Sequence, residues 1–240
     1  MRARVFFTAA EVDAALTLDQ TAVVIDVLRA TSTIVQALAA GARAIYPVPG
    51  AEEAIRLASS LGREDTLLCG ERKGLKVPGF DLGNSPLEFT PERVEGMRLV
   101  MSTTNGTRAL HAAGGAGRVL ALSLLNLEAV TRAVRGAEDL AIVCAGREDR
   151  FSLEDAVCAG LALEKLLEGS EDHRLDDSAR AALALARSFV PDAAFLGTVE
   201  GGRALLAIGM GSDVEHCARR DLHAIVPEMQ ERMIRAADVT

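Results

Sequence analysis

The feature that most constrains this chain is a repeated alternation of short apolar runs with amphipathic helical patterns. Near-continuous apolar runs occupy residues 21–28, 43–49, 66–72, 98–104, 119–126 and 140–146. Helical patterns follow them at 33–41, 51–62, 106–113, 127–136 and 151–169. Strands that are buried on both faces read as continuous apolar runs, and helices connect parallel strands. The sequence therefore predicts a three-layer α/β/α fold with a mainly parallel sheet.

Beyond residue 170 the pattern weakens, and we expect one helix at 178–189, another near 213–220 and a last strand at 222–227. A chain of 240 residues can bury one large core, so we treat residues 1–240 as a single unit. A subdivision near 1–125 and 126–240, into two similar subdomains with a site in the crevice between them, stays open. In parallel sheets, ligands bind beyond the carboxyl ends of the strands.

Charge and cysteine usage exclude several classes of partner. The formal net charge of −8 argues against binding to nucleic acid or to an anionic membrane, although local arginines can still hold a small anionic substrate. No apolar run reaches the roughly 18 residues that a membrane-spanning helix needs. The cysteines are scattered without a CxxC pair, as in reduced cytoplasmic proteins. We therefore expect a cytoplasmic protein, while association into a homodimer stays open.

Two strand ends carry clusters of polar side chains just before a helical pattern. The first cluster contains Asp26, Arg29, Thr31, Ser32 and Thr33, and the second contains Thr103, Thr104, Asn105, Gly106 and Thr107. Hydroxyls and backbone N–H groups at a helix N-terminus bind anions, and arginine adds a bidentate donor. Asn-Gly also permits a left-handed turn that aims successive N–H groups at an oxyanion. The alternative is that both clusters are ordinary turns with one capping hydroxyl each.

Carboxylates near three strand ends are candidates for a metal site or for direct attack. Asp26 is suited to bind a divalent cation or to act as a nucleophile. Glu71 and Arg72 follow the apolar run that starts at residue 66, where an acid–base pair can also be plain surface. Glu154 and Asp155 begin the longest helical pattern, and either could join Asp26 at a metal. Asp155 also fits a helix-capping pattern.

Cys144 and Arg150 raise a different mechanism. They are spaced as in the C-x5-R loops of cysteine-dependent phosphatases, which need a thiolate of low pKa. Glu148 and Asp149 would lie inside such a loop, where they would repel both the thiolate and a phosphate group. This alternative needs no metal, so metal dependence separates it from a carboxylate site.

Several of these segments, in this order, resemble the 2-phosphosulfolactate phosphatase family. The resembling segments are IDVLRATSTI (25–34), GA (41–42), LLCGERKG (67–74), FDLGNSPLE (80–88), STTNGTRAL (102–110), FSLEDAVCAG (151–160) and, more loosely, DVEHCARRDLHAIVP (213–227). RATST, GNSP and TTNGT are far more specific in combination than alone. The resemblance implies a three-layered α/β/α fold with its site in a crevice between two parts of the chain.

The resemblance also implies an activity. It is the magnesium-dependent hydrolysis of 2-phospho-3-sulfolactate, or of a related phosphorylated 2-hydroxy carboxylic acid, to 3-sulfolactate and phosphate, a step in coenzyme M biosynthesis. Such an ester carries phosphate, carboxylate and sulfonate groups and needs several anion-binding groups. A module that binds phosphorylated ligands without turnover is the alternative from another class of protein.

The expected site combines three groups of residues. Catalytic roles are expected for Asp26, Arg29, Glu71 and Arg72. Contacts with the substrate and its phosphate are expected from Thr31, Ser32, Asn84, Ser85, Thr103, Thr104, Asn105, Gly106 and Thr107. Mg²⁺ is expected on Asp26 with Glu154 or Asp155, because magnesium takes one or two carboxylates plus waters. Whether Asp26 attacks phosphorus or only holds the metal stays open at this point.

Overall fold

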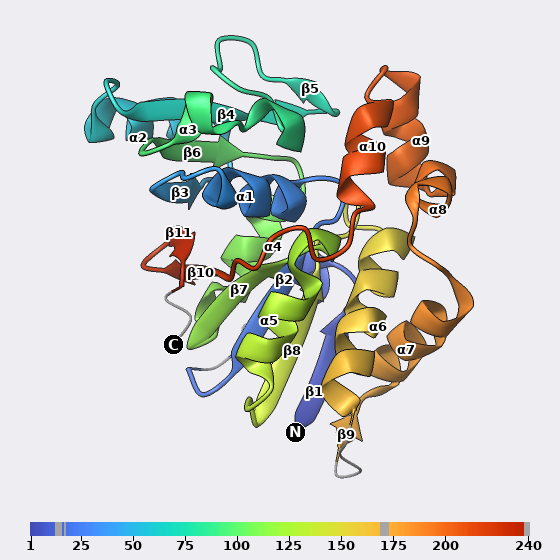
Figure 1. The fold of residues 1–240 in the computed structure, drawn as a ribbon. Helices are drawn as coiled ribbons and strands as arrows, with labels where there is room; N and C mark the ends of the chain where they lie inside the picture. The colour runs from blue at the N-terminus through green and yellow to red at the C-terminus, as the bar shows by residue number, and fades with distance from the viewer. Residues whose placement is uncertain (13–15, 17, 169–172, 238–240) are drawn as a thin grey trace.

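The computed structural model describes residues 1–12, 16, 18–168 and 173–237. Within them the predicted α/β architecture is confirmed, because helices cover both faces of one large, mainly parallel sheet (Figure 1). Its strands are β1 (Arg2–Phe6), β2 (Thr21–Ile25), β3 (Ala44–Pro47), β4 (Thr66–Arg72), β5 (Leu75–Lys76), β6 (Arg98–Ser102), β7 (Arg118–Leu122), β8 (Asp139–Cys144), β9 (Arg174–Leu175), β10 (Pro227–Gln230) and β11 (Met233–Ala236). Their order across the 11-stranded sheet is β5-β4-β6-β3-β11-β10-β7-β2-β8-β1-β9.

The sheet consists of two parallel blocks joined by an antiparallel hairpin. β4, β6 and β3 pair in parallel in one block, and β7, β2, β8, β1 and β9 pair in parallel in the other. The hairpin of β10 and β11 lies between them, with β11 against β3 and β10 against β7. β2 pairs with β7 and with β8, which lie on opposite sides of residue 125 in the chain. The sheet is therefore continuous across residue 125, near which a subdivision of the chain stayed open.

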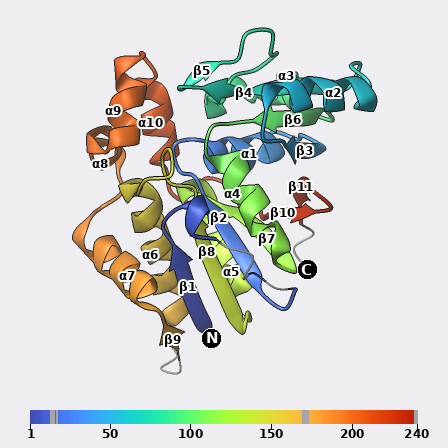
Figure 2. The ribbon, with the colours of Figure 1, turned by 180° about the vertical axis from the view of Figure 1, so that it is seen from behind.

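The helices are α1 (Ala30–Ala39), α2 (Ala51–Leu61), α3 (Pro91–Val94), α4 (Gly106–Ala112), α5 (Leu127–Val134), α6 (Leu153–Leu167), α7 (Asp177–Ser188), α8 (Ala193–Thr198), α9 (Glu200–Ala207) and α10 (Gly211–Cys217). Short 3-10 turns are η1 (Ala9–Glu11), η2 (Pro86–Glu88), η3 (Ala113–Gly115) and η4 (Leu124–Asn126). α5, α6 and α7 cover one face of the block that contains β2, and the view from behind shows α4 on its other face (Figure 2). α8, α9 and α10 form a separate group above the ends of β2 and β8 (Figure 1).

Alternate residues of the central strands enter two different cores. Val23 and Ile25 of β2 join the core that includes side chains of α5, α6 and α7. Ala22 and Val24 point to the opposite core, which includes side chains of α1 and α4. Successive strand residues face opposite sides of a sheet, so a strand covered on both faces has to be apolar throughout. This explains why the run ends abruptly at the first polar residue, Asp26, at the edge of the sheet.

Several elements differ from the prediction. β1 was not expected, because its sequence RARVF alternates arginine with apolar residues, yet it pairs in parallel with β8. The predicted strand at 222–227 is wrong: residues 222–226 are not in a strand, and β10 starts only at Pro227 and pairs with β11. α8 and α9 were also not expected. The helices predicted at 178–189 and 213–220 correspond to α7 and α10, while residue 169, the predicted end of the 151–169 helix, lies outside the described residues.

Two general expectations can be compared with the described part of the chain. No helix there has the length and apolar content needed to cross a membrane. All four cysteines, Cys69, Cys144, Cys158 and Cys217, are free thiols with no solvent exposure. Each thiol is therefore shielded inside the fold.

Candidate active site

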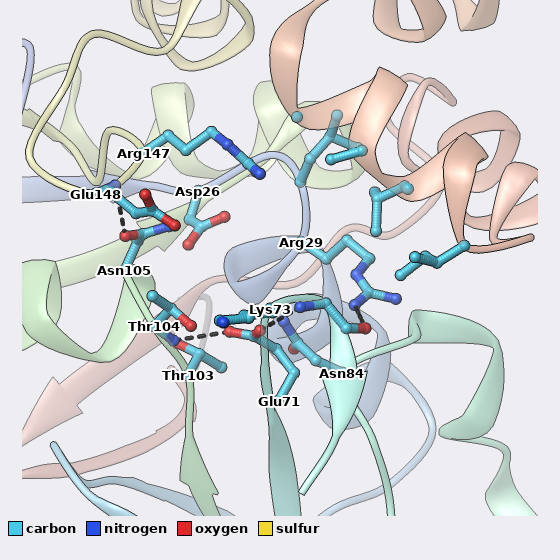
Figure 3. A pocket seen from close by; sticks show the side chains of 16 residues that line it. Asp26, Arg29, Glu71, Lys73, Asn84, Thr103, Thr104, Asn105, Arg147 and Glu148 are labelled. Carbon is cyan, nitrogen blue, oxygen red and sulfur yellow. Dashed lines mark hydrogen bonds between the residues drawn. The ribbon is translucent and has the colours of Figure 1, made fainter.

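A polar pocket lies where the ends of β2, β4, β6 and β8 meet α9 (Figure 3). Its polar lining residues are Asp26, Arg29, Glu71, Lys73, Asn84, Thr103, Thr104, Asn105, Arg147 and Glu148. Apolar lining comes from Leu28 and from residues in or just after α9, which are Ala204, Leu205 and Ile208. The carboxyl edge of the strands is where parallel α/β sheets bind ligands.

Asp26 is the first residue after β2, and its carboxylate is 7% exposed in the pocket wall. Its Oδ1 accepts a 3.2 Å hydrogen bond from Ala30 N at the start of α1. Its Oδ2 lies so close to Gly106 of α4 that a Cβ at Gly106 would come within 2.7 Å. Burial raises the pKa of Asp26 to about 7, helped by the charges of Glu71 and Glu154. A carboxyl group that titrates near neutrality can hold a cation or exchange a proton at physiological pH.

Three further carboxylates are buried near Asp26. Glu71 lies at the end of β4, and Glu154 and Asp155 lie in the first turn of α6. Asp155 accepts a 2.9 Å hydrogen bond from Val27 N, and burial together with the charges of Asp26 and Glu154 raises its pKa well above the usual range. Burial also raises the pKa of Glu154. Segments far apart in the sequence thus bring four acids to one end of the sheet.

The chemistry of these carboxylates fits a divalent cation. Buried charges of like sign cost free energy unless a proton or a cation neutralises them, which is why the pKa values of Asp26, Glu154 and Asp155 rise. Among the described residues, no three His, Cys, Asp or Glu side chains converge into a complete metal cluster. Mg²⁺ does not require one, because it binds one or two carboxylates and fills its other positions with water and substrate oxygens.

Glu71 and Arg72, both expected to be catalytic, lie in different places. Glu71 lines the pocket, and its two oxygens accept hydrogen bonds from Thr104 N at 2.7 Å and from Gly74 N at 2.8 Å (Figure 3). Arg72 does not line the pocket; it donates to the Ser102 carbonyl at 3.1 Å and to the Ser102 hydroxyl at 2.8 Å. Arg72 therefore ties β4 to β6, and its expected catalytic role stays a prediction.

The hydroxyls of the first junction turn away from the pocket. Thr31 and Ser32 have no solvent exposure, and neither lines the pocket. The Thr31 hydroxyl donates to Asp26 O at 2.8 Å and accepts from Asp26 N at 3.0 Å, and the Ser32 hydroxyl donates to Val27 O at 2.8 Å. These hydroxyls therefore fix the loop that presents Asp26, and their expected contact with substrate stays a prediction.

The second junction is divided between the pocket and its own turn. Thr103, Thr104 and Asn105 line the pocket (Figure 3). The Thr104 hydroxyl is buried and has no hydrogen-bond partner among the described residues. Thr107 has no exposure and donates from its hydroxyl to Thr103 O at 3.0 Å, so it closes the turn and does not reach the pocket. Gly106 has no side chain, so its backbone can lie close to the Asp26 carboxylate.

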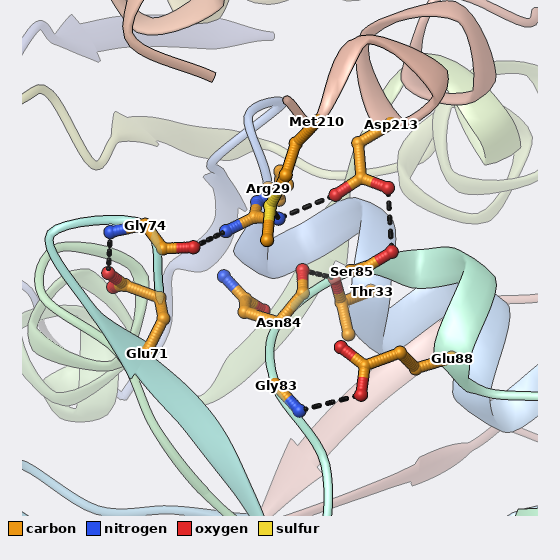
Figure 4. Close-up of polar contacts among 10 residues, drawn as sticks. All are labelled: Arg29, Thr33, Glu71, Gly74, Gly83, Asn84, Ser85, Glu88, Met210 and Asp213. Carbon is orange, nitrogen blue, oxygen red and sulfur yellow. Dashed lines mark hydrogen bonds and ion pairs between the residues drawn. The ribbon is translucent and has the colours of Figure 1, made fainter. Parts of the chain in front are cut away.

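Arg29 and the GNSP segment meet α10 beside the pocket (Figure 4). Arg29 is 3% exposed, lines the pocket and donates to Gly74 O at 2.7 Å and to Asp213 at 2.5 Å. Ser85 donates to the same carboxylate at 2.6 Å and does not line the pocket, so its expected substrate contact stays a prediction. Asn84 does line it, and its buried Oδ1 has no partner among the residues that the structure describes.

Burial argues against the cysteine-based alternative. Cys144 ends β8 inside a hydrophobic core and has no exposure. Burial raises the pKa of the Cys144 thiol well above its ordinary value, whereas a phosphatase cysteine needs a lowered one. Arg150 pairs with Glu200 at 3.4 Å, has a side chain 64% exposed and does not line the pocket. The two residues therefore do not form a phosphate-binding loop around a thiolate.

Sequence reasoning missed three charged residues of the pocket lining. Lys73 lies in the turn between β4 and β5 and has a φ of 53°, and Glu148, in the loop after β8, has a φ of 50°. Arg147 lies in the same loop, and Glu148 N donates to Asn105 Oδ1 at 3.0 Å (Figure 3). Single charges in loops have no periodicity to mark them, so only their positions beside predicted strand ends could have pointed to them.

Comparison with known proteins gives the same family as the sequence motifs. A family model described as 2-phosphosulpholactate phosphatase matches residues 6–232. Three similar proteins are each named "Probable 2-phosphosulfolactate phosphatase". The protein of Symbiobacterium thermophilum is 44% identical over 89% of this chain and 92% of its own length. Those of Caldanaerobacter subterraneus subsp. tengcongensis and Thermotoga petrophila are 40% and 42% identical, over 91% and 88% of this chain and 91% and 89% of their own lengths. The chain therefore belongs to the 2-phosphosulpholactate phosphatase family.

Proposed function

We propose that this chain is a magnesium-dependent phosphatase that hydrolyses 2-phospho-3-sulfolactate, or a closely related phosphorylated 2-hydroxy carboxylic acid, to the hydroxy acid and phosphate. The observation that carries the proposal is the position of Asp26. This buried carboxyl group has a pKa of about 7 and faces a pocket that positively charged side chains also line. The names of the similar proteins support the substrate.

The pocket lining suits a small ester with several negative charges. Arg29, Lys73 and Arg147 reach it from three separate loops (Figure 3). Arg29 is buried and fixed by hydrogen bonds, which suits a constant anion contact. Phosphate, carboxylate and sulfonate are each acceptors for such cations and for the hydroxyl of Thr104 and backbone N–H groups. Phosphoryl transfer depends mainly on positioning and on stabilising charge, and these residues supply both.

Asp26, with Glu154 or Asp155, is the proposed holder of Mg²⁺. A bound Mg²⁺ would supply positive charge to a phosphoryl group in the pocket. We assign Asp26 to cation binding and to orienting the attacking water. Its carboxylate is fixed between Ala30 N and Gly106, which leaves it little freedom to move onto phosphorus. Glu71, fixed by two backbone N–H groups, positions the loops of Lys73 and Thr104.

The test is phosphate release from 2-phospho-3-sulfolactate and from 2-phospholactate, first with Mg²⁺ and then with EDTA. We expect release that requires Mg²⁺ and that favours the sulfonated ester. Release that persists in EDTA would contradict the metal-dependent assignment. Ligand-induced thermal stabilisation without any release would instead indicate a binding module.

We also propose that the enzyme acts in the cytoplasm on small molecules alone. Four buried free thiols suit a reducing compartment. The net charge of −8 disfavours nucleic acid as a partner. Light scattering on the purified chain would decide whether it forms a homodimer.

A further inference from the structure

Asp213 of α10 lies far from Asp26 in the sequence, and no motif assigned it a role, yet it touches the site through Arg29. The structure assigns Asp213 as a positioning residue that holds the Arg29 guanidinium in place for an anionic group in the pocket. This inference rests on the proposed function, and it extends that function to the helical group α8–α10.

The ion pair is buried on both sides. The Arg29 and Asp213 side chains are 2% and 4% exposed, and Nη1 and Oδ2 are 2.5 Å apart. A buried guanidinium requires a counter-ion, and here Asp213 supplies it. Without Asp213, the Arg29 guanidinium would be drawn towards Asp26, a carboxylate of opposite charge that also lies in the pocket lining. Asp213 therefore keeps this cation on the α10 side of the pocket.

The position of Asp213 is itself fixed. Its second oxygen, Oδ1, accepts a 2.6 Å hydrogen bond from the Ser85 hydroxyl (Figure 4). On the other side, Arg29 Nη2 donates to Gly74 O at 2.7 Å. The guanidinium is thus held between α10 and the β4–β5 turn, and Met210 packs against its Nη1. Because Asp213 and Gly74 both hold the guanidinium, the N–H groups of Arg29 that do not bond to them keep a fixed orientation.

The same network also orders neighbouring parts of the pocket wall. Asn84, which precedes Ser85, lines the pocket, and its carbonyl accepts a 2.9 Å hydrogen bond from the Thr33 hydroxyl. Gly74, which accepts from Arg29, also lines the pocket and donates to Glu71. Asp213 thereby connects α10 to wall residues that three other segments contribute.

A double-mutant cycle separates positioning from simple stabilisation. Asp213→Asn keeps the size of the side chain but removes its charge, and Arg29→Gln removes the cation. Misplacement of a substrate-binding group costs on the order of 10²-fold, so we expect each single variant to lower kcat/KM by roughly that factor. Either variant leaves one buried charge unpaired and is expected to melt at a lower temperature.

The double variant Arg29→Gln/Asp213→Asn removes both charges of the ion pair, so its melting temperature is expected to recover towards wild type. Its kcat/KM should stay at the level of Arg29→Gln alone, because Asp213 acts only through Arg29. Recovery of kcat/KM together with melting temperature, or an Asp213→Asn effect that adds fully to that of Arg29→Gln, would overturn the inference. Ser85→Ala should give a smaller loss in kcat/KM than Asp213→Asn.

A control and a second readout keep this test independent of the proposed function. Glu228→Gln breaks the Arg118–Glu228 pair of 2.9 Å, which does not touch the pocket, and should leave kcat/KM unchanged. If the wild type releases no phosphate from either ester, the proposed function fails. Calorimetry with inorganic phosphate then tests the inference, which predicts weaker binding in Arg29→Gln and in Asp213→Asn. Equal phosphate binding in the wild type and both variants would overturn it.

Discussion

The two strand–helix junctions of the site have nearly the same sequence plan and use it in opposite ways. Both place hydroxyl side chains just before a helix or in its first turn, close to a strand end. At the β2–α1 junction the hydroxyls of Thr31 and Ser32 bond to their own loop, and the carboxylate of Asp26 faces the pocket. At the β6–α4 junction Thr103 and Thr104 line the pocket. Hydroxyl content therefore marks the site, while the backbone of each turn decides which atoms face a ligand.

The junctions also depend on each other. The Asp26 carboxylate from the first packs against Gly106 from the second, with no room between them for a side chain. The β2–α1 junction supplies the negative charge of Asp26. The β6–α4 junction supplies a backbone that lies close to this carboxylate and polar residues of the pocket lining. The following changes test this division of roles.

The largest effect is expected at Asp26. Asp26→Asn should lower kcat by at least about 10²-fold, because it removes the charge assigned to cation binding. Without Mg²⁺ the same variant should melt at a higher temperature than wild type, since it no longer buries a carboxyl group whose pKa is raised to about 7. Steady-state kinetics and thermal unfolding measure both. Near wild-type turnover would contradict the role of Asp26.

The second effect concerns the contact between the junctions. A Cβ at Gly106 would come within 2.4 Å of the Ala30 Cβ and 2.7 Å of Asp26 Oδ2. Gly106→Ala should therefore displace the carboxylate, lower kcat by about tenfold or more and cost about 1–3 kcal/mol of stability through overpacking. Gly114→Ala is the matched control, because a Cβ there meets nothing within 4 Å. Equal activity of the two variants would show that close packing at Gly106 is unimportant.

Smaller effects are expected when a hydroxyl is removed, and they should differ between the two junctions. Thr31→Val removes two buried hydrogen bonds to the Asp26 backbone and should cost about 1–3 kcal/mol of stability. Thr104→Val removes a buried hydroxyl without a partner in the described structure, so stability should hold while KM rises a few-fold. Urea unfolding and kinetics on both variants measure the contrast. If Thr31→Val kept its stability while Thr104→Val lost stability, the roles given to the two hydroxyls would be contradicted.

The last effect, which needs no substitution in the wild type, is a dependence of stability on pH. The pKa of Asp26 is about 7 in the folded chain and 3.8 as its ordinary value. Between those values the folded state keeps a proton that the unfolded state has lost, so stability without metal should fall as pH rises from about 4 to 7. Thermal unfolding in EDTA across this range measures the slope, which should be shallower in Asp26→Asn. A slope of the opposite sign in the wild type would argue against a buried, uncompensated Asp26.

The sequence predicted the fold well where patterns are local. Apolar runs and helical periods located β2, β4, β6 and β8 and the helices that follow them, and hence the edge at which the pocket lies. The hairpin β10–β11 was missed because its pairing with β3 and β7 joins residues more than a hundred positions apart.

The site was predicted less completely, for the same reason. Asp26 and Asn105 carry local signals, because they stand at the ends of recognisable strands. Arg147 lies in an irregular loop, and Asp213 reaches the site only through a contact with Arg29 across 184 residues. The direction of the Ser85 hydroxyl depends on Asp213 in turn, so no local pattern could have shown that it faces away from the pocket.

We propose that Asp26, with Glu154 or Asp155, holds a divalent cation. Titration calorimetry of Mg²⁺ into the wild type, Asp26→Asn and Glu11→Gln tests it directly without a substrate. Glu11 is a control carboxylate outside the pocket lining, which accepts a 3.0 Å hydrogen bond from Phe7 N. We expect Mg²⁺ to bind the wild type and Glu11→Gln with the same affinity. In Asp26→Asn we expect Mg²⁺ binding to be lost or at least about tenfold weaker. Equal Mg²⁺ affinity in all three proteins would contradict it.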